Sequence, residues 1–467
     1  MELHQQLFKN HVRFSEQSLK HRQFKHQHIL PLIEKLKHSS LFQVSTAGKS
    51  FEDRDIYSIR CGTGPKKILL WSQMHGDEPT ATMALFDIFN FINNPGDLNS
   101  FRNQLLKEAT LVFIPMLNPD GAEVHKRRNA QGLDLNREAL NLTGPEAKVL
   151  KDVHDQFNPD FGFNLHDQSF YYSAGESPNP ATISWLAPAY NYEREFNPVR
   201  TRAMQVIAEV DRQIQNFIPG CTARYDDAFE PRAFGDNIQK WGTSTILVES
   251  GGYPFDYEKQ FIRKINFVLL LSAFDSIISE NYAQRQLSEY ESIPENKSRL
   301  FDLLIRNVEF NKNGKRYRTD LGIIQNSIDP VAPDLTLFKG TVDDIGDLHN
   351  RYGYQEIDGS KLKLESGKCY QKKISNWDDL QDFNFRHLLE QGYTELAVKK
   401  GLDEVKYNPY PINVHKDFTE NIKIDLNTPA NLLIKSEDKI RYVIVNGFLF
   451  DPEKELTSIR NAMLYTN

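Results

Sequence analysis

The stretch SQMHGDEPT, residues 72–80, presents two side chains with reactive potential, His75 and Glu78, three positions apart. Imidazole nitrogens and carboxylate oxygens are common ligands of zinc, so the pair has the residue types of half a metal site. The same stretch also suits a polar turn, because Pro79 and Thr80 are typical of a helix start. His-x-x-Glu is short enough to arise by chance, so this stretch alone leaves both interpretations open.

Two further reactive side chains follow apolar runs elsewhere in the chain. DFGFNL is followed by His166, and TILV is followed by Glu249. In open α/β sheets, ligands bind beyond the carboxyl ends of the strands. His75, Glu78 and His166 would supply the two histidines and one glutamate that a catalytic zinc often uses, with water in the fourth position. Glu249 would remain as the base that takes the proton of that water.

A second His-Asp-Gln triplet begins at His154 and competes with the one at His166. The first triplet lies late in a predicted helix, GPEAKVLKDVHDQF, whereas only the second follows a predicted strand. The helix macrodipole adequately explains a histidine in the last turn of a helix. We therefore expect His166, and not His154, to be the ligand.

A cluster of basic residues lies, in the sequence, between the two halves of this expected metal site. The segment HKRRNAQGLDLNRE, residues 125–138, contains Arg127, Arg128, Asn136 and Arg137. A guanidinium is a planar fork that suits a carboxylate, and near a metal it stabilises a developing oxyanion. A solvated basic loop is the alternative interpretation, since most basic clusters are of that kind.

Alternating apolar runs and helical segments, from about residue 51 onward, would position these side chains. The runs are KKILLWSQ, TLVFIPML, DFGFNL and TILVES, with helical patterns such as PTATMALFDIFNFI between them. Short apolar strands separated by helices are typical of a mostly parallel sheet covered on both faces. The pattern YEKQFIRKINFVLLLSAFDSIISENY predicts a long helix that closes this domain.

The chain of 467 residues is too long for one ordinary core, and its pattern changes twice. We expect a helical segment over residues 1–45 packed on the next domain, an α/β domain over residues 46–290, and a smaller, mainly β accessory domain over residues 300–467. Asn-Gly within NVEFNKNGKRYRTDLGIIQ and KIRYVIVNGFLFD predicts two hairpins in the last domain. In the first segment a loose 3.6-residue period predicts helix over the first forty residues, and its histidines, including His26 and His28, are expected on a solvated face.

The composition indicates which partners and which cellular location to expect. The formal charge of -7 lacks a basic footprint, so no nucleic-acid partner is expected. The sequence has no apolar run that would span a bilayer and no signal-like start, so we expect no membrane partner and a cytoplasmic location. Cys61, Cys221 and Cys369 are far apart, which favours neither a disulfide framework nor a cysteine zinc site. The oligomeric state stays open.

Five segments occur in a fixed order: HGDE, NPDG, RRNAQGLDLNR, FNLH and ILVESGG. Together they resemble the zinc carboxypeptidase (M14, carboxypeptidase A-like) superfamily, over roughly residues 50–280. The resemblance implies a three-layer α/β/α fold with a mixed eight-stranded sheet, and one zinc ion per chain held by His75, Glu78 and His166. It implies no metal ligand at Asp77.

The resemblance also implies a role for each remaining site residue. Arg127 matches the arginine that polarises the scissile carbonyl, and Glu249 matches the general acid/base. Asn136 and Arg137 match the pair that holds the terminal carboxylate of the substrate. Tyr225 stands at about the distance before the base at which many members place a mobile tyrosine over the substrate.

The function implied is that of a zinc-dependent metallocarboxypeptidase, which hydrolyses the C-terminal amide bond of a peptide through a zinc-bound water activated by glutamate. Its partner would be a peptide or amino-acid conjugate with a free C-terminal carboxylate. A zinc-dependent deacylase of N-acyl amino acids, of the aspartoacylase or succinylglutamate desuccinylase type, is the alternative, because it shares His-x-x-Glu and Asp-Leu-Asn-Arg. A non-catalytic binding protein would predict damage to a ligand or to the base.

Arg232 and Asp236 either face the side-chain pocket or form a surface pair.

Overall fold

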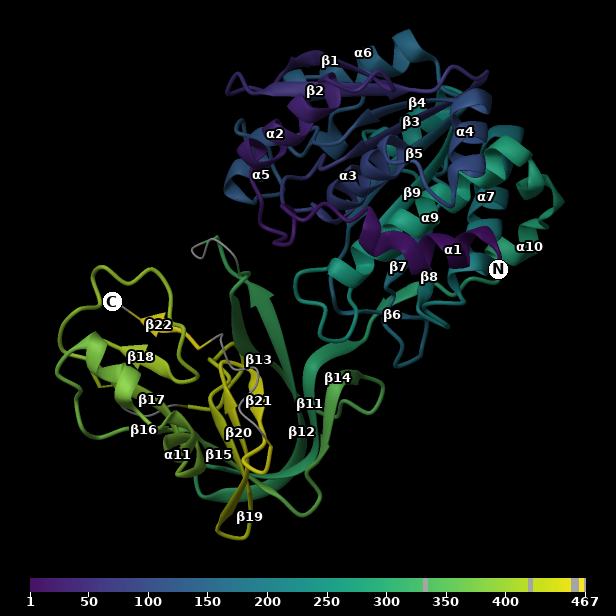
Figure 1. Cartoon of the computed structure of the whole chain (residues 1–467). Coiled ribbons are helices and arrows are strands. Elements are labelled where there is room, and N and C mark those ends of the chain that lie inside the picture. Colours follow the sequence, from purple (N-terminus) through teal and green to yellow (C-terminus); the bar gives the residue numbers. More distant parts are fainter. Residues whose placement is uncertain (331–334, 419–422, 455–461, 466–467) are drawn as a thin grey trace. The chain divides into compact units, whose positions relative to one another are not determined.

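The computed structural model divides the chain into two compact units (Figure 1), unit 1 over Met1–Ser298 and unit 2 over Arg299–Asn467. The structure describes residues 1–330, 335–418, 423–454 and 462–465. Each unit has hydrophobic core clusters of its own. Among the described residues, no helix has both the length and the apolar character needed to cross a membrane.

Unit 1 contains the mixed eight-stranded sheet that the resemblance implied. Its strands are β1 (Phe42–Lys49), β2 (Asp55–Cys61), β3 (Lys66–Ser72), β4 (Ala109–Ile114), β5 (Phe161–Asp167), β7 (Ile183–Leu186), β8 (Thr222–Arg224) and β9 (Ser244–Ser250), in the order β1-β2-β4-β3-β5-β9-β7-β8. The central strands β4, β3, β5 and β9 run parallel, whereas β2 and β7 flank them as antiparallel neighbours. A small separate pair is formed by β6 (Tyr172–Ala174) and β10 (Asn296–Ser298).

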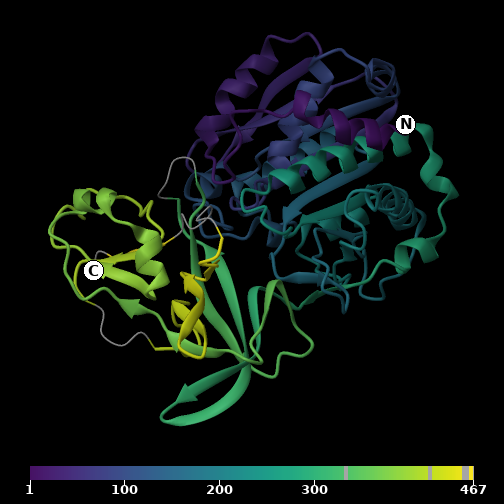
Figure 2. The same cartoon turned by 60° about the horizontal axis from the view of Figure 1, so that its bottom comes forward.

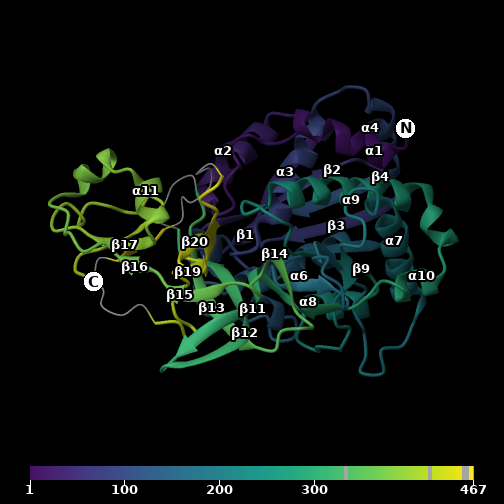
Figure 3. The same ribbon diagram turned by 90° about the horizontal axis from the view of Figure 1, so that it is seen from below.

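Helices cover both faces of this sheet, which confirms the three-layer prediction. They are α1 (Leu3–Asn10), η1 (His11–Arg13), α2 (His26–Lys37), α3 (Thr80–Asn93), α4 (Asn99–Glu108), α5 (Pro119–Val124), η2 (Leu135–Arg137), α6 (Pro145–Phe157), α7 (Pro198–Ile214), α8 (Phe234–Lys240), α9 (Gln260–Ser279), η3 (Asn281–Gln284) and α10 (Leu287–Glu291). Successive side chains of a strand point to opposite faces. Accordingly, Ile68 and Leu70 of β3 join the core cluster under α3, α7 and α9, while Leu69 and Trp71 join the cluster under α6 and α8. Figure 3 shows α3 and α9 on one side of β3, and α6 and α8 on the other.

The N-terminal segment differs from the prediction in two ways. Helix is interrupted over residues 14–25, where tertiary hydrogen bonds hold the backbone instead: Glu16 N donates to Asp87 Oδ1 at 2.7 Å, and Leu19 O accepts from Arg263 at 2.6 Å. The histidines do not all lie on a solvated face, since His4, His11 and His26 are buried whereas His28 is exposed. Hydrogen bonds between the backbone and buried charged side chains thus take the place of helix here.

Unit 2 is mainly β, as expected. Its larger sheet comprises β11 (Leu300–Lys312), β12 (Lys315–Ser327), β13 (Phe338–Gly346), β14 (Tyr352–Asp358), β15 (Lys363–Ser366), β19 (Leu432–Ser436), β20 (Lys439–Val445) and β21 (Phe448–Phe450). A second sheet comprises β16 (Lys368–Cys369), β17 (Tyr393–Ala397), β18 (Asn413–His415) and β22 (Leu464–Tyr465), next to η4 (Trp377–Asp382) and α11 (Phe385–Glu390).

Both predicted hairpins form in unit 2. The turns Asn313-Gly314 and Asn446-Gly447 have positive φ at both residues, 55° and 79° in the first and 49° and 80° in the second. That conformation matches the twist of two-residue hairpins, and asparagine and glycine tolerate it best. Figure 2 shows the first hairpin, β11–β12, as a long curved ribbon in green.

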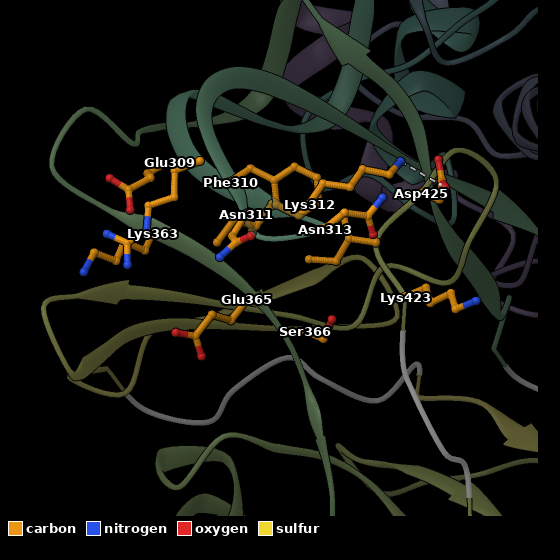
Figure 4. A pocket seen from close by; sticks show the side chains of 13 residues that line it. Glu309, Phe310, Asn311, Lys312, Asn313, Lys363, Glu365, Ser366, Lys423 and Asp425 are labelled. Atoms are coloured by element: carbon orange, nitrogen blue, oxygen red, sulfur yellow. Dashed lines mark hydrogen bonds and ion pairs between the residues drawn. The ribbon is translucent and has the colours of Figure 1, made fainter.

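A polar cavity of about 800 Å³ lies beside this hairpin, between β11, β15 and residues 423–425 (Figure 4). Its lining mixes both signs of charge, with Lys312, Arg316, Lys363 and Lys423 opposite Glu309, Glu365 and Asp425. Lys312 pairs with Asp425 at 3.1 Å, so part of the charge is already compensated. The lining therefore favours no one sign of ligand charge.

Candidate active site

The carboxyl ends of three neighbouring strands bring four reactive side chains to one edge of the sheet in unit 1. His166 in β5 and Glu249 in β9 are direct cross-strand partners, and β3, which precedes His75 and Glu78, pairs with β5 on its other side. In the turn after β3, Gly76 lies directly against another stretch of backbone. A Cβ at Gly76 would stand 2.0 Å from the carbonyl carbon of Gly121 in the NPDG segment, so only glycine fits.

The side chains of His75, Glu78 and His166 converge on one point. One ligand atom from each lies within 4.8 Å of the others, and all three residues are buried. The two Glu78 oxygens stand 2.7 Å from His75 Nδ1 and 2.6 Å from His166 Nδ1. Two imidazole nitrogens and a carboxylate in contact are the donor set of a catalytic zinc site, so these residues fit that metal. Within the described residues, no other group of three such side chains gathers in this way.

The charges of this group are strongly coupled. Burial favours a neutral Glu78, but the two histidines outweigh burial and hold the pKa of Glu78 well below its usual range. Burial likewise disfavours a charged His75, yet Glu78 and Asp134 raise the pKa of His75 to about 9. A carboxylate that stays ionised at neutral pH suits a cation, and a cation must displace the proton of His75 to bind there.

Asp134 is the residue of this site that the sequence analysis missed. Its Oδ1 lies 3.1 Å from His75 Nε2, so His75 is fixed with Nδ1 toward Glu78. Its Oδ2 accepts from Arg127 Nη2 at 3.0 Å, and Arg127 Nη1 stands 3.3 Å from Glu78 Oε1. The segment GLDLNR contained the signal, because an acid beside the basic cluster can orient a histidine ligand.

Replacing Asp134 by Asn should weaken metal binding by about 10- to 100-fold, because a partner that orients a ligand histidine raises its basicity. The measurement is the zinc dissociation constant from competition with a coloured chelator. Asp155 offers a matched control, since it lies 3.1 Å from a histidine outside the group, His154. An unchanged constant in Asp134→Asn would show that Asp134 does not support the metal site.

Glu249 stands next to the three-residue group, as the cross-strand partner of His166. Its Oε2 atom is buried and accepts no hydrogen bond from a described residue. Burial and the neighbouring Glu78 carboxylate raise the pKa of Glu249 well above its usual range. A carboxylate with a raised pKa and a free oxygen at the edge of a metal site has the properties of a general base.

Three other predicted residues lie around this centre. Tyr225 follows β8, and burial, the Glu249 charge and the neighbouring Tyr172 raise the pKa of its hydroxyl. Asn136 accepts from the backbone N–H of Phe234 at 3.0 Å through its side-chain oxygen. Arg137 lies on the same turn, where its Nε stands 3.4 Å from Glu230 Oε2.

Arg232 and Asp236 do not pair with each other. Arg232 is exposed and binds Glu230 at 2.9 Å, whereas Asp236 is buried and accepts from the Glu230 backbone N–H at 3.1 Å. Burial raises the pKa of Asp236 to about 7. The surface-pair interpretation is therefore wrong, because the intervening Glu230 takes both contacts.

The loop that carries Arg127 and Asp134 is held by a buried amide. Asn129 Oδ1 accepts from the backbone N–H groups of Gln131 and Leu133, and its Nδ2 donates to Glu146 Oε2 at 3.0 Å. Glu146 stands at the start of α6 and also accepts from Phe51 N at 3.2 Å. Contacts within the loop and with the start of α6 thus fix its shape, and Phe51 in turn holds Glu146.

His154 is buried in α6 and takes no part in the metal group. Its Nε2 lies 3.1 Å from Thr243 Oγ1, and its ring packs on Trp241 with centroids 5.2 Å apart. The expected distinction between the two His-Asp-Gln triplets is therefore seen in the structure: His166 reaches the group and His154 does not.

Comparison with known proteins gives one family. The zinc carboxypeptidase family model matches residues 29–211. Carboxypeptidase SOL1 of Arabidopsis thaliana is 28% identical over 128 residues, which are 24% of this chain and 26% of that protein. Carboxypeptidase D of Rattus norvegicus is 27% identical over 132 residues, 25% of this chain and 10% of that protein. The chain thus spans about a quarter or less of the length of these relatives.

Solved structures of carboxypeptidases also align with this chain. A metallo-carboxypeptidase from Burkholderia cenocepacia aligns with a TM-score of 0.46 and 15% identity, over 55% of this chain and 70% of that chain. A metallo-carboxypeptidase from Pseudomonas aeruginosa aligns with a TM-score of 0.42 and 18% identity, over 54% and 69% of the two chains.

Proposed function

We propose, from the premise that residues 29–211 belong to the zinc carboxypeptidase family, that the protein is a zinc-dependent metallocarboxypeptidase. It would release the C-terminal residue of a peptide, or of an amino-acid conjugate with a free carboxylate. The observation that carries the proposal is the gathering of His75, Glu78 and His166 beside Glu249, at one edge of the sheet. One zinc ion per chain would bind to the first three.

Each side chain of the centre would do one part of the hydrolysis. Zinc, when bound, supplies a Lewis acid that polarises the scissile carbonyl and acidifies water. Glu249 takes the proton of the attacking water, because burial and the neighbouring Glu78 carboxylate raise its pKa and so make it a stronger base. Arg127 presents its guanidinium beside His75 and Glu78, where it stabilises the oxyanion that develops. The proton held by Glu249 then passes to the leaving amine.

The free carboxylate of the substrate would bind to Arg137 and Asn136, on the turn that follows Asp134. Arg137 Nη1 donates to the carbonyl oxygen of Asn136 at 2.7 Å, which leaves other guanidinium N–H groups for a ligand. A guanidinium is a fork for a carboxylate, and such charge-assisted bonds are the stronger ones.

Replacing Arg137 by Gln should raise KM for a peptide by about 10-fold or more, because a charge-assisted bond contributes about 1.5–3 kcal/mol. Steady-state kinetics on paired peptides, one with a free carboxylate and one with a C-terminal amide, measure this. The wild-type protein should prefer the free carboxylate, and Arg137→Gln should lose the preference. Arg232→Gln is the matched control, since Arg232 also pairs with Glu230 but would not hold the carboxylate. Equal preference in Arg137→Gln and wild type would contradict the assignment.

Zinc content and a mass-spectrometric screen of peptides that differ only in their C-terminal residue test the function as a whole. N-acyl amino acids in the same screen separate the carboxypeptidase from a deacylase, the alternative that shares its zinc ligands. Release of acyl groups with intact peptides would replace the proposed function by that alternative.

A further inference from the structure

Lys259 is a buried cation behind the proposed metal centre. It immediately precedes α9, and only 1% of its surface is exposed. Its Nζ donates to Asp167 Oδ2 at 3.1 Å and to the Ser250 carbonyl oxygen at 2.8 Å. It also stands 4.7 Å from the centroid of the Phe170 ring, on the ring face. The ammonium is thus removed from solvent and fully directed at fixed partners.

These partners are the last residues of β5 and β9, one position beyond His166 and Glu249. Asp167 and Ser250 are cross-strand partners, and Lys259 bonds to both, so it fixes the two strand ends to each other. Asp167 extends the connection to the segment that carries His75 and Glu78. Its backbone N–H donates to Glu78 Oε2 at 3.2 Å, and its Oδ2 accepts from Thr80 Oγ1 at 2.6 Å.

Stability alone is a weak reason for such a group. Removing an ammonium and a carboxylate from water costs free energy that their attraction only partly returns, so a buried pair is poor evidence of stabilisation. Groups that orient ligands, in contrast, typically change metal affinity or activity by 10- to 100-fold. The location of Lys259, where the two ligand-bearing segments meet the strand that carries Glu249, favours the second role.

We propose that Lys259 is a positioning residue that holds His166, Glu249 and Glu78 in register through Asp167 and the Ser250 carbonyl. The proposal builds on the proposed function, because it assumes that these residues form the metal centre. Lys259 itself contacts neither metal nor substrate. It would act by keeping the ligand atoms close to the geometry that binding and proton transfer need.

Arg263 provides a matched control one turn further along α9. It is also a fully buried cation, and its Nε pairs with Asp87 Oδ2 at 2.7 Å, but Asp87 lies in the middle of α3 and touches none of the ligand segments. Lys259→Met and Arg263→Met each remove one buried cation from the same helix end and keep an unbranched side chain. If Lys259 only stabilises the fold, the two variants should have similar zinc affinities. If Lys259 positions the metal centre, only Lys259→Met should weaken zinc binding.

The test measures the zinc dissociation constant of the full chain by chelator competition, the melting temperature of the zinc-free protein, and kcat and KM. Lys259→Met should raise the zinc dissociation constant by about 10-fold or more and lower kcat more than it raises KM. Arg263→Met should lower the melting temperature at least as much, with a zinc dissociation constant within about twofold of wild type. Equal weakening in both variants, or none in Lys259→Met, would overturn the proposal.

Asp167→Asn serves where Lys259→Met does not fold, because it keeps the side-chain size and weakens the same pair. It should raise the zinc dissociation constant as Lys259→Met does, and an unchanged constant would likewise refute the role. The zinc measurement is independent of any substrate. A chain that binds zinc but releases no C-terminal residue would disprove the proposed function and leave the role of Lys259 to be decided by the zinc data.

Discussion

Replacing Glu249 by Gln is expected to lower kcat by about 100- to 10,000-fold while the protein keeps its zinc, because a positioned general base contributes that range. Glutamine has the size of glutamate but cannot take a proton from water. Glu249 is not one of the three gathered ligands, so the metal should stay bound. The measurements are single-turnover peptide hydrolysis and zinc content of the same sample. Turnover close to that of wild type would remove Glu249 from the mechanism.

The pH dependence of the wild-type protein gives the same assignment an independent check. The base acts only when ionised, and burial raises the pKa of Glu249 above the usual carboxyl value of about 4.3. Activity should therefore fall as the pH drops through this raised pKa, earlier than for an exposed glutamate. In Glu249→Gln the residual rate should lack this acid limb.

Replacing His166 by Ala should abolish stoichiometric zinc binding and, with it, peptide hydrolysis. The variant loses one of three ligands in a buried site, which should weaken zinc by more than the roughly 100-fold that an outer partner costs. Metal analysis after gel filtration measures the zinc retained per chain.

His154→Ala is the matched control for that experiment, because the two histidines share the local sequence His-Asp-Gln and are both buried. His154 contacts Thr243 and Trp241, so its loss should lower the melting temperature and leave one zinc per chain. Full zinc retention in His166→Ala would show that His166 is not a ligand. Zinc loss in His154→Ala would show that His154 supports the metal site.

Much of the site was predictable because it depends on strand order and period. His166 and Glu249 end apolar runs, and parallel strands bring such ends to one edge, so their proximity followed from pattern alone. The Asn313-Gly314 and Asn446-Gly447 turns were equally visible, because few residue pairs adopt positive φ at both positions. In these cases a rule about neighbouring residues in the sequence is enough to predict the contact that the structure shows.

What the sequence did not show depends on contacts between distant segments. Lys259 stands in the polar stretch Asp-Tyr-Glu-Lys-Gln, where a solvated lysine is the ordinary expectation, and only the fold buries it. Val12 falls on the loose helical period predicted for the first forty residues, yet it lies in the short 3-10 helix η1 and is 75% exposed. Asp134 lies within the recognised segment RRNAQGLDLNR, but its role depends on His75 Nε2 pointing toward it in the fold.

The anchoring of the N-terminal segment on Arg263 has a consequence for the order in which the molecule is completed. Leu19 and Arg263 are hydrogen-bonded but 244 positions apart in the chain. At the usual rate of synthesis of about 5–20 residues per second, the segment leaves the ribosome roughly 10–50 s before its partner exists. During that interval Asp87 lacks its guanidinium, and His11 Nε2 is another buried side-chain contact of Asp87, at 2.7 Å in the finished fold. The hydrogen bonds from Arg263 to Leu19 and Glu16 thus form only after α9 has been made.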